Sequence, residues 1–243
     1  MKVLITSGGT KIPIDKVRDI TNMSTGTFGT RIAEEILRRG HKVAFFRAKN
    51  SKSPMRIVAD VNSGNMSPKQ YSIWYNERRL WTELYREMEY STFEQYERGL
   101  SIFIGCEKPD VIVLAAAVSD YAVENPFNGK IRSNDMLTIH LTSLPKIINK
   151  VKGWAPYAKL IGFKLMVGSR SDDLISAART SCIENECEFV VANDLEDIKG
   201  GKHKLTLVYP RGVSSVYETD FTDPNYLAKT VVNHIEATMR IDS

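Results

Sequence analysis

The chain has 243 residues, of which 42% are hydrophobic and 26% are charged, a composition typical of globular proteins. Its formal net charge is only +4, without a basic run or an RNA-binding aromatic signature, so we expect small anionic ligands such as phosphates rather than nucleic acid. No segment approaches the roughly 18 consecutive apolar residues of a membrane span, and three cysteines without metal-ligand spacing or a signal peptide indicate a cytoplasmic protein without a metal centre.

Short apolar runs alternate with helix-period patterns along the chain, which predicts an α/β fold. The expected strands lie at 2–6, 42–47, 56–59, 111–115, 137–141, 160–163 and 189–192. Those near residues 3, 43, 112, 160 and 190 are continuously apolar, as strands buried in a parallel sheet are. The expected helices lie at 26–39, 145–151, 171–186 and 224–239. This order predicts a mostly parallel sheet flanked by helices.

Residues 49–105 interrupt this order and read as an insertion. The stretch 49–69 is rich in Ser, Asn, Gly and Pro, which predicts a loop. The stretch 70–104 has helical spacing, with a bend expected at Gly99. Two aromatic faces are expected on this helical segment, one of Trp74, Trp81, Tyr85 and Met88 and one of Phe93, Tyr96, Leu100 and Phe103. Such faces indicate core packing or, less commonly, a partner surface.

The C-terminal part predicts a hairpin. Residues 204–209 and 215–218 alternate apolar and polar side chains on either side of a Pro-Arg-Gly turn, as two antiparallel strands do. We therefore expect one domain over residues 1–243, with a C-terminal antiparallel hairpin and a helical insertion at about 49–105.

The first strand ends in the motif TSGGT at residues 6–10. Gly8 and Gly9 would let a phosphate approach the backbone, although tight turns use glycine too. The next glycine is Gly26, so the GxGxxG dinucleotide motif fails on spacing. Gly26 and Gly29 open the following helix. They either allow close packing of helix on strand or face an anion at the helix N-terminus, and the spacing leaves both readings open.

Small and polar residues also follow the other central strands. Residues 116–121, AAVSDY, offer a floor for a flat ring, and Asp120 can accept from a ribose or a base, or cap a turn. Gly162 and Phe163 end the strand near 160, and Asn193 and Asp194 end the strand near 190. Because parallel strands end at one edge of a sheet, these residues together predict a nucleotide site there.

These motifs resemble the phosphopantothenoylcysteine synthetase family, the phosphopantothenate–cysteine ligases of coenzyme A biosynthesis. The matching segments follow the family's order at 6–10, 15–18, 20–26 with Gly29, 116–121, 130–131, 145–148, 162–163 and 192–194. The resemblance implies a Rossmann-like fold, a homodimer, and a standalone ligase without the flavin-dependent decarboxylase that precedes it in many bacteria.

The resemblance also implies a two-step reaction. The carboxylate of phosphopantothenate attacks the α-phosphate of a nucleoside triphosphate, with CTP expected ahead of ATP and Mg²⁺ present. This gives an acyl-nucleotidylate and pyrophosphate. The amine of L-cysteine then displaces the nucleoside monophosphate and forms an amide.

The residue roles follow from the same resemblance. Asn22 matches an asparagine that contacts the acyl intermediate, and Lys130 matches a catalytic lysine. Nucleotide-binding positions are expected at Gly8, Gly9, Ala116, Asp120, Pro145, Ile147 and Phe163. Substrate-binding positions are expected at Ser24, Thr25, Gly26, Asn193 and Asp194.

The chain departs from the family pattern at its cations. Arg132 and Ser133 stand where many bacterial members have lysines after the catalytic one. Ser181 and Asn185 stand where lysines often point toward the triphosphate. Arg179, one turn earlier, is a substitute for them, and we include it among the nucleotide-binding residues.

Two other functions compete with the ligase. An NAD(P)-dependent short-chain reductase would share the sheet, and Arg47 after the second strand could bind a 2′-phosphate. It would require the missing GxGxxG and a Tyr-x-x-x-Lys pair, which the chain lacks. A non-catalytic nucleotide-binding protein would explain the missing phosphate-side lysines.

Overall fold

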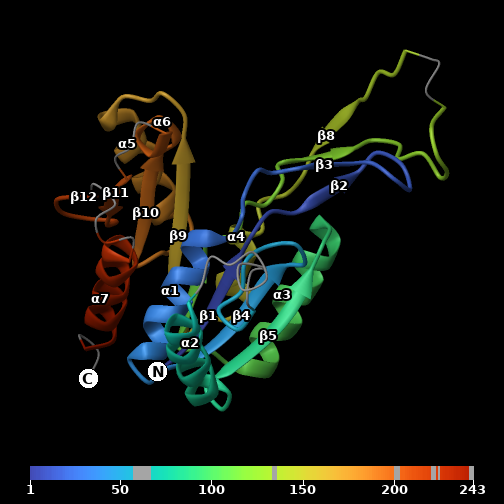
Figure 1. Cartoon of the computed structure of the whole chain (residues 1–243). Helices are drawn as coiled ribbons and strands as arrows, with labels where there is room; N and C mark the ends of the chain where they lie inside the picture. The colour runs from blue at the N-terminus through green and yellow to red at the C-terminus, as the bar shows by residue number, and fades with distance from the viewer. Residues whose placement is uncertain (57–66, 133–135, 200–202, 220–222, 224, 241–243) are drawn as a thin grey trace.

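The computed structural model describes residues 1–56, 67–132, 136–199, 203–219, 223 and 225–240 of the chain. Within them, eight strands form one sheet in the order β12-β11-β10-β9-β6-β1-β4-β5 (Figure 1). The parallel strands are β1 (Lys2–Ser7), β4 (Lys42–Ala48), β5 (Tyr85–Tyr90), β6 (Val111–Leu114), β9 (Lys159–Met166) and β10 (Phe189–Asp194). The antiparallel strands β11 (His203–Val208) and β12 (Ser215–Thr219) extend one edge.

Helices cover both faces of this sheet, because successive side chains of a strand point to opposite faces. On one face, α1 (Thr27–Arg38), α2 (Pro68–Trp81) and α7 (Tyr226–Arg240) enclose a core that includes Val3, Ile5 and Phe45. On the other, α3 (Phe93–Glu107), α4 (Ile148–Trp154) and α5 (Ser171–Glu184) pack with Leu4 and Phe46. The short α6 (Leu195–Lys199) follows β10. Among the described residues, no helix is both long and apolar enough to cross a membrane.

The structure confirms the predicted α/β fold. The strands expected near residues 3, 43, 112, 160 and 190 are all present and pair in parallel. The helices expected at 26–39, 171–186 and 224–239 are present with small shifts at their ends, and the C-terminal hairpin pairs as predicted. The central strands are buried along their length, and for this reason they appear in the sequence as continuous apolar runs.

The expectation of continuous helix over 70–104 is wrong. Residues Tyr85–Tyr90 form the edge strand β5, which pairs in parallel with β4. Tyr85 and Met88 therefore belong to a strand and share no helical face with Trp74 and Trp81. The second expected face is confirmed, because it forms the buried side of α3. Gly99 lies inside α3 and marks no bend; a Cβ there would lie 2.7 Å from Phe46 Cζ, so the glycine permits close packing of α3 on β4.

Four further boundaries differ from the sequence expectations, one of them the end of β9, which lies at Met166 and not at Phe163. Of the strand expected at 137–141, only Leu141 is extended, at the start of β8 (Leu141–Ser143). The helix expected at 145–151 is α4, which begins three residues later at Ile148, because residues 145 and 146 still belong to the loop. The strand expected at 56–59 lies outside the described residues except for Arg56, which is not extended.

Two short antiparallel ribbons form an arm that projects from the body of the molecule (Figure 1). One pairs β2 (Lys11–Pro13) with β3 (Asp19–Thr21), and the other pairs β7 (Tyr121–Val123) with β8. The backbone N–H of Phe127 donates to Ile14 O (2.9 Å) and that of Lys16 donates to Gly129 O (2.9 Å), so the two ribbons are joined. No pattern in the sequence indicates this arm.

Candidate functional site

The predicted site begins where β1 and β6 end. The backbone N–H of Ala117 donates to Gly8 O (2.8 Å), and the N–H of Thr10 donates to Ala117 O (3.2 Å). The side-chain amide of Asn22 also donates to Ala117 O (2.7 Å), and a Cβ on Gly9 would lie 2.8 Å from Asn22 O. Asn22 is thus held directly over the glycine pair. Its Oδ1 makes no hydrogen bond with the described residues, so it remains available to accept one from a ligand.

The N-terminus of α1 lies beside the same glycines. Gly26, the N-cap, has a φ of +73° and its carbonyl accepts from Ser7 Oγ (3.0 Å). No side chain caps the helix, since the hydroxyls of Thr25 and Thr27 lie within 2.8 Å of each other instead. A helix N-terminus without a side-chain cap, with its positive dipole end, suits a phosphate or carboxylate. A Cβ on Gly29 would lie 2.7 Å from Ser7 Oγ, so this glycine permits close packing of α1 on β1, while the contact with an anion stays a prediction.

Replacing Gly26 by alanine should destabilise the fold more than replacing Gly40, the other left-handed glycine flanking α1. Their φ angles are +73° and +75°, but a Cβ on Gly26 would lie 2.8 Å from Ser7 Oγ and 3.0 Å from Ser51 Cβ, whereas Gly40 has open space. Gly40→Ala should cost only the left-handed strain, about 1–2 kcal/mol, and Gly26→Ala about 1–3 kcal/mol more for the overlap. Urea unfolding of both variants measures the difference; equal losses would contradict the close approach.

Asp120 and the 145–147 segment come together at the loop after β6. Lys146 Nζ lies 2.5 Å from Asp120 Oδ1, and the N–H of Leu144 donates to Asp120 O (2.8 Å). Both charged side chains are more than half exposed, so water screens the pair and a ribose hydroxyl can compete for the carboxylate. Ile147 is buried and Pro145 is exposed. The structure therefore brings these nucleotide-binding candidates together where the loop between β6 and β7 meets the loop between β8 and α4.

Phe163 lies inside β9, three residues before the strand ends at Met166 and not at the strand end expected from the sequence, and Ala116 lies two residues beyond the end of the neighbouring strand β6. The half-buried Phe163 ring makes an edge-on contact with Phe28 in the first turn of α1, with the centroids 6.0 Å apart. The N–H of Ala116 donates to Thr6 Oγ1 (3.2 Å). Phe28 was missed as a site neighbour; its place two residues after Gly26 was the available signal.

The two residues that end β10 have different surroundings. Asp194 is nearly buried and accepts hydrogen bonds from the backbone N–H groups of Gly168, Ser169 and Glu196 and from Ser169 Oγ, at 2.8–3.0 Å. Its oxygens are thus engaged within the chain, and it anchors the loop between β9 and α5. Asn193 is half-buried and makes no side-chain hydrogen bond with the described residues, so it is the better placed of the two to contact a ligand.

The ionised form of Asp194 should stabilise the fold in a defined pH window. Backbone N–H donors, first that of Ser169, lower the pKa of Asp194 from 3.8 to about 2. A depressed pKa means that this contribution is present above pH 3.8 and is lost as pH falls through about 2. We expect Asp194→Asn to unfold at lower denaturant than the wild type at neutral pH, with the difference shrinking between about pH 4 and pH 2. A pH-independent difference in urea midpoint would contradict this.

The guanidinium of Arg179, predicted to bind the nucleotide, forms hydrogen bonds within the chain instead. It donates to Tyr209 O (2.9 Å) and to Ser214 Oγ (3.2 Å), and so holds the turn of the β11–β12 hairpin against α5. The replacement for the lysines missing at Ser181 and Asn185 therefore needs another source, because the nitrogens of this guanidinium already serve the hairpin.

Lys130 lies on the arm, and its loop is pinned there by Asp15. Asp15 Oδ1 accepts the N–H groups of Val17 and Arg18 (2.8 Å each), and Oδ2 accepts that of Ile131 (3.1 Å). Burial works to raise the pKa of Asp15, but these N–H donors outweigh it and the pKa is lowered. Arg18 also donates to Ile131 O (3.1 Å). The position of Lys130 is thus fixed by its neighbours' backbone, while its own ammonium is exposed.

A cavity of about 520 Å³ opens beside Lys130 on the arm. Its walls include Arg132 and His140 together with apolar side chains of Ile14, Val123, Phe127 and Ile139. Ser133, where many family members have a lysine, lies outside the described residues. Among the described residues, no hydrogen bond or ion pair joins Lys130 to the sheet-edge group around Asn22, so the structure leaves these two catalytic candidates on separate elements.

Arg47 does not serve as a 2′-phosphate ligand. Its side chain is fully buried, and Nη1 donates to the carbonyls of Ala48, Lys49 and Ser51, each at 3.0 Å. The other two guanidinium nitrogens, Nε and Nη2, form ion pairs with Glu87 and Glu89 of β5. The reductase alternative therefore loses the one residue that favoured NADP.

Tyr90 was missed entirely by the sequence analysis. Its buried hydroxyl donates to Ser7 O (2.7 Å) and lies 3.3 Å from Gly8 O, so it supports the glycine pair from β5. Burial raises the pKa of Tyr90 well above 10.0, so the hydroxyl stays protonated as a donor.

The comparisons with known proteins agree with this geometry. The profile of the DNA/pantothenate metabolism flavoprotein C-terminal domain matches residues 1–67 and 101–239. The bifunctional coenzyme A biosynthesis protein CoaBC of Thermococcus kodakarensis is 34% identical over 207 residues, which cover 85% of this chain and 44% of that protein. Mouse phosphopantothenate–cysteine ligase is 31% identical over 229 residues, which cover 81% of this chain and 73% of the mouse enzyme.

A solved structure supports the same assignment. The Streptococcus pneumoniae DNA/pantothenate metabolism flavoprotein superposes with a TM-score of 0.77 at 28% identity, over 98% of this chain and 99% of that one. The chain spans less than half of the archaeal bifunctional relative but nearly three quarters of the mouse ligase. The chain therefore belongs to the DNA/pantothenate metabolism flavoprotein C-terminal domain family, together with phosphopantothenate–cysteine ligases.

Proposed function

We propose that this protein joins 4′-phosphopantothenate and L-cysteine into phosphopantothenoylcysteine, in coenzyme A biosynthesis, and that residues 1–243 form one ligase domain with an insertion at about 49–105. The observation that carries the proposal is the placement of Asn22 over Gly9, beside the uncapped N-terminus of α1. An amide side chain beside a helix N-terminus suits an acyl phosphate, which carries both a carbonyl and a phosphoryl group.

In the first step, a carboxylate oxygen of phosphopantothenate attacks the α-phosphorus, the bond to pyrophosphate breaks, and an acyl-nucleotidylate forms. Gly8, Gly9 and the N-terminus of α1 at Gly26 hold the phosphoryl oxygens in this proposal, and Asn22 contacts the acyl group. In the second step, the cysteine amine attacks the acyl carbon, the bond to the nucleoside monophosphate breaks, and the amine loses a proton. Lys130 stabilises the negative charge that develops at the acyl phosphate in both steps.

The remaining roles divide between nucleotide and substrate. Asp120 accepts from the ribose, and the base lies against a pocket formed by Ala116, Phe163, Pro145 and Ile147. Ser24 and Thr25 shape the substrate side of Gly26, and Asn193 contacts substrate from β10 while Asp194 holds its loop. CTP is the expected nucleotide and ATP the alternative. Among the described residues, no group of three or more His, Cys, Asp or Glu side chains could hold a metal, so Mg²⁺ enters our proposal only as a companion of the triphosphate.

We further propose that the protein is a homodimer in which a second copy covers the arm. The arm is a thin pair of ribbons that cannot bury its own apolar side chains, and a partner surface is the usual reason for such exposure. Its exposed apolar residues include Val17 (62%), Tyr121 (55%), Phe127 (54%), Leu137 (46%) and Leu141 (48%). Sedimentation equilibrium should give a dimer, and Phe127→Ser with Tyr121→Ser should shift it toward monomer.

Product analysis tests the proposed reaction. Purified protein is incubated with phosphopantothenate, cysteine and Mg²⁺ with either CTP or ATP, and the mixture is analysed by mass spectrometry. The proposal predicts phosphopantothenoylcysteine and the matching nucleoside monophosphate. The absence of both with either nucleotide would favour a non-catalytic nucleotide-binding protein. Quenching or enhancement of NADPH fluorescence on titration would favour the reductase.

A further inference from the structure

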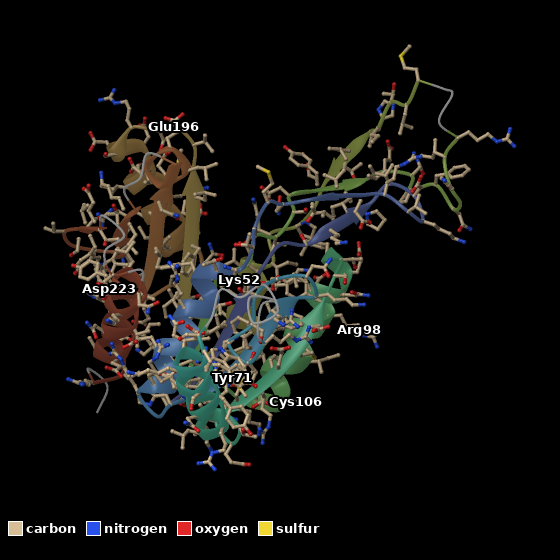
Figure 2. The ribbon with its side chains drawn as sticks, viewed as in Figure 1. Lys52, Tyr71, Arg98, Cys106, Glu196 and Asp223 are labelled. Atoms are coloured by element: carbon tan, nitrogen blue, oxygen red, sulfur yellow. The ribbon has the colours of Figure 1, made fainter. Side chains whose placement is uncertain are left out.

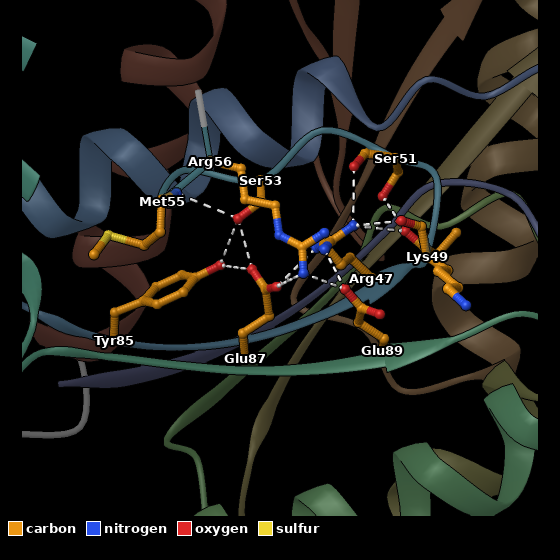
Figure 3. A network of polar contacts seen from close by, with 10 residues as sticks. Arg47, Lys49, Ser51, Ser53, Met55, Arg56, Tyr85, Glu87 and Glu89 are labelled. Atoms are coloured by element: carbon orange, nitrogen blue, oxygen red, sulfur yellow. Dashed lines mark hydrogen bonds and ion pairs between the residues drawn. The ribbon is translucent and has the colours of Figure 1, made fainter. Parts of the chain in front are cut away.

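Arg47, the second-last residue of β4, is fully buried, yet the reaction described above does not use it. Nη1 donates to three carbonyls of the following loop, those of Ala48, Lys49 and Ser51. Nη2 donates to a carboxylate oxygen of Glu89, and Nε lies 3.0 Å from Glu87 Oε1 as an ion pair without hydrogen-bond alignment (Figure 3). A buried guanidinium is costly unless it is paired on every side, and here each nitrogen faces an acceptor.

The two carboxylates come from β5, the strand beside β4. Glu87 and Glu89 lie two residues apart and therefore project from the same face of the strand. Glu87 also accepts from Ser53 Oγ (2.6 Å) and from the hydroxyl of Tyr85, and Arg56 donates to Glu89 Oε1 (2.6 Å). The loop after β4 is thus folded around the Arg47 cluster, which we define as Arg47, Glu87 and Glu89 (Figure 3).

The same loop is one wall of the proposed site. A Cβ on Gly8 would lie 2.7 Å from Ser51 Cβ and 2.7 Å from Ala48 Cβ, and a Cβ on Gly26 would lie 3.0 Å from Ser51 Cβ. The backbone N–H of Lys52 donates to Thr25 O (3.0 Å), directly before α1. Figure 2 shows Lys52 on the body of the molecule, below the point where the arm leaves it, and its side chain is exposed. The loop therefore touches both glycines and the residue before the α1 N-terminus.

We propose that Arg47, fixed by Glu87 and Glu89, is a positioning residue that sets the loop of residues 48–53 against Gly8 and Gly26 and thereby the geometry of the phosphoryl-binding wall. This inference rests on the proposed ligase function. Arg47 contacts no reactant and acts through Ser51 and Lys52. The segment that carries Glu87 and Glu89 lies outside the residues that the family profile matches, so this chain fixes its wall with carboxylates from its own insertion.

Two variants and a matched control test the role. Arg47→Lys keeps the charge but loses Nη1, which donates to three carbonyls. Glu89→Gln keeps the shape but removes one negative charge from the cluster. Glu236→Gln is the control, because Glu236 pairs with Arg39 (2.9 Å) and His41 (3.0 Å) at the opposite end of α1. Each variant is assayed for kcat and KM well below its melting temperature, and amide hydrogen exchange is followed for residues 26–30 and 51–52.

We expect Arg47→Lys to lower kcat about 10- to 100-fold, as a displacement near 1 Å in a reaction site does, with the KM for cysteine little changed. Glu89→Gln should show the same pattern more weakly, and both should speed exchange at residues 26–30 and 51–52. Glu236→Gln should do neither. Folded variants with wild-type kcat and unchanged exchange would overturn the proposal. So would a loss of activity that only follows the unfolded fraction.

The test separates this inference from the proposed function. If the wild-type protein forms no product with CTP or ATP, the ligase proposal fails on its own. Hydrogen exchange then decides the positioning role, because it needs no turnover. Faster exchange at residues 26–30 and 51–52 in Arg47→Lys and Glu89→Gln, but not in Glu236→Gln, would support it, and equal exchange in all three would overturn it.

Discussion

Replacing Lys130 by glutamine should reduce amide formation about 100- to 1000-fold, the usual effect of removing one charge-stabilising donor from a reaction site. The fold should survive, because the Lys130 side chain is exposed and its loop is held by Asp15 through the backbone of Ile131. A glutamine keeps a donor of similar length but loses the positive charge. The measurement is the steady-state rate of phosphopantothenoylcysteine formation, with circular dichroism to verify folding.

Lys16→Gln is the matched control for this prediction. Lys16 is an exposed lysine of the same arm, and its backbone N–H donates to Gly129 O, next to Lys130. It should retain most of the wild-type rate, since no role in the reaction is assigned to it. A Lys130→Gln protein that works as fast as Lys16→Gln would remove Lys130 from the proposed mechanism.

Replacing Asn22 by aspartate should slow amide formation about 10- to 100-fold and release nucleotidylate into solution. The Asn22 amide donates to Ala117 O (2.7 Å), and a carboxylate there would face a carbonyl oxygen and repel the acyl phosphate. The loss of one such hydrogen bond costs about 1–3 kcal/mol, and about 1.4 kcal/mol corresponds to tenfold in rate. In our proposal Asn22 contacts the acyl group of the nucleotidylate, so its loss should let nucleotidylate escape before cysteine attacks, and pyrophosphate release should exceed amide formation.

The ratio of pyrophosphate to amide is the measurement for Asn22→Asp. In the wild type the two products should form in equal amounts. Asn233→Asp is the control, because Asn233 uses its side-chain oxygen to accept from Arg39 (2.8 Å) on an exposed surface, and aspartate can do the same. Equal product amounts and unchanged kinetics in Asn22→Asp would contradict the contact between Asn22 and the acyl intermediate.

The central sheet was predictable because its strands are buried on both faces, and this burial alone produces continuous apolar runs in the sequence. The strands around Leu4, Phe45, Ile112, Ile161 and Val191 are apolar on both faces, and their parallel order follows from the helices between them. The alignment of their carboxyl ends then places Gly8, Ala116 and Asn193 at one edge, whereas Phe163 lies three residues before the end of β9. This part of the candidate site is a consequence of topology.

The edge strand and the arm were not predictable in the same way. In β5 the sequence YREMEY places charges between its apolar residues, and its aromatic spacing imitates a helix face. Its strand conformation depends on pairing with β4, from which it is distant in sequence. The arm strands β2, β3, β7 and β8 are three residues long, too short for a periodic pattern to identify.

Long-range contacts explain the remaining misses. The partner of Arg47, Glu89, lies 42 residues later in the chain, and nothing in the sequence near Arg47 indicates this pairing. An arginine at the end of a strand was therefore interpreted as a possible ligand-binding residue. Arg179 reads as a phosphate ligand for the same reason, although the hairpin carbonyl of Tyr209 occupies it. A sequence indicates which residues can bind an anion, whereas the fold decides which of them are already paired.

Pyrophosphate release from the purified wild-type protein tests the central claim most directly. The assay contains Mg²⁺ and either CTP or ATP, with and without phosphopantothenate, and cysteine is added last. We expect release that requires phosphopantothenate, begins before cysteine is added and becomes continuous once cysteine is present, with the faster nucleotide identifying the base. Release that is independent of phosphopantothenate, or no release with either nucleotide, would contradict the assignment of this chain as a ligase.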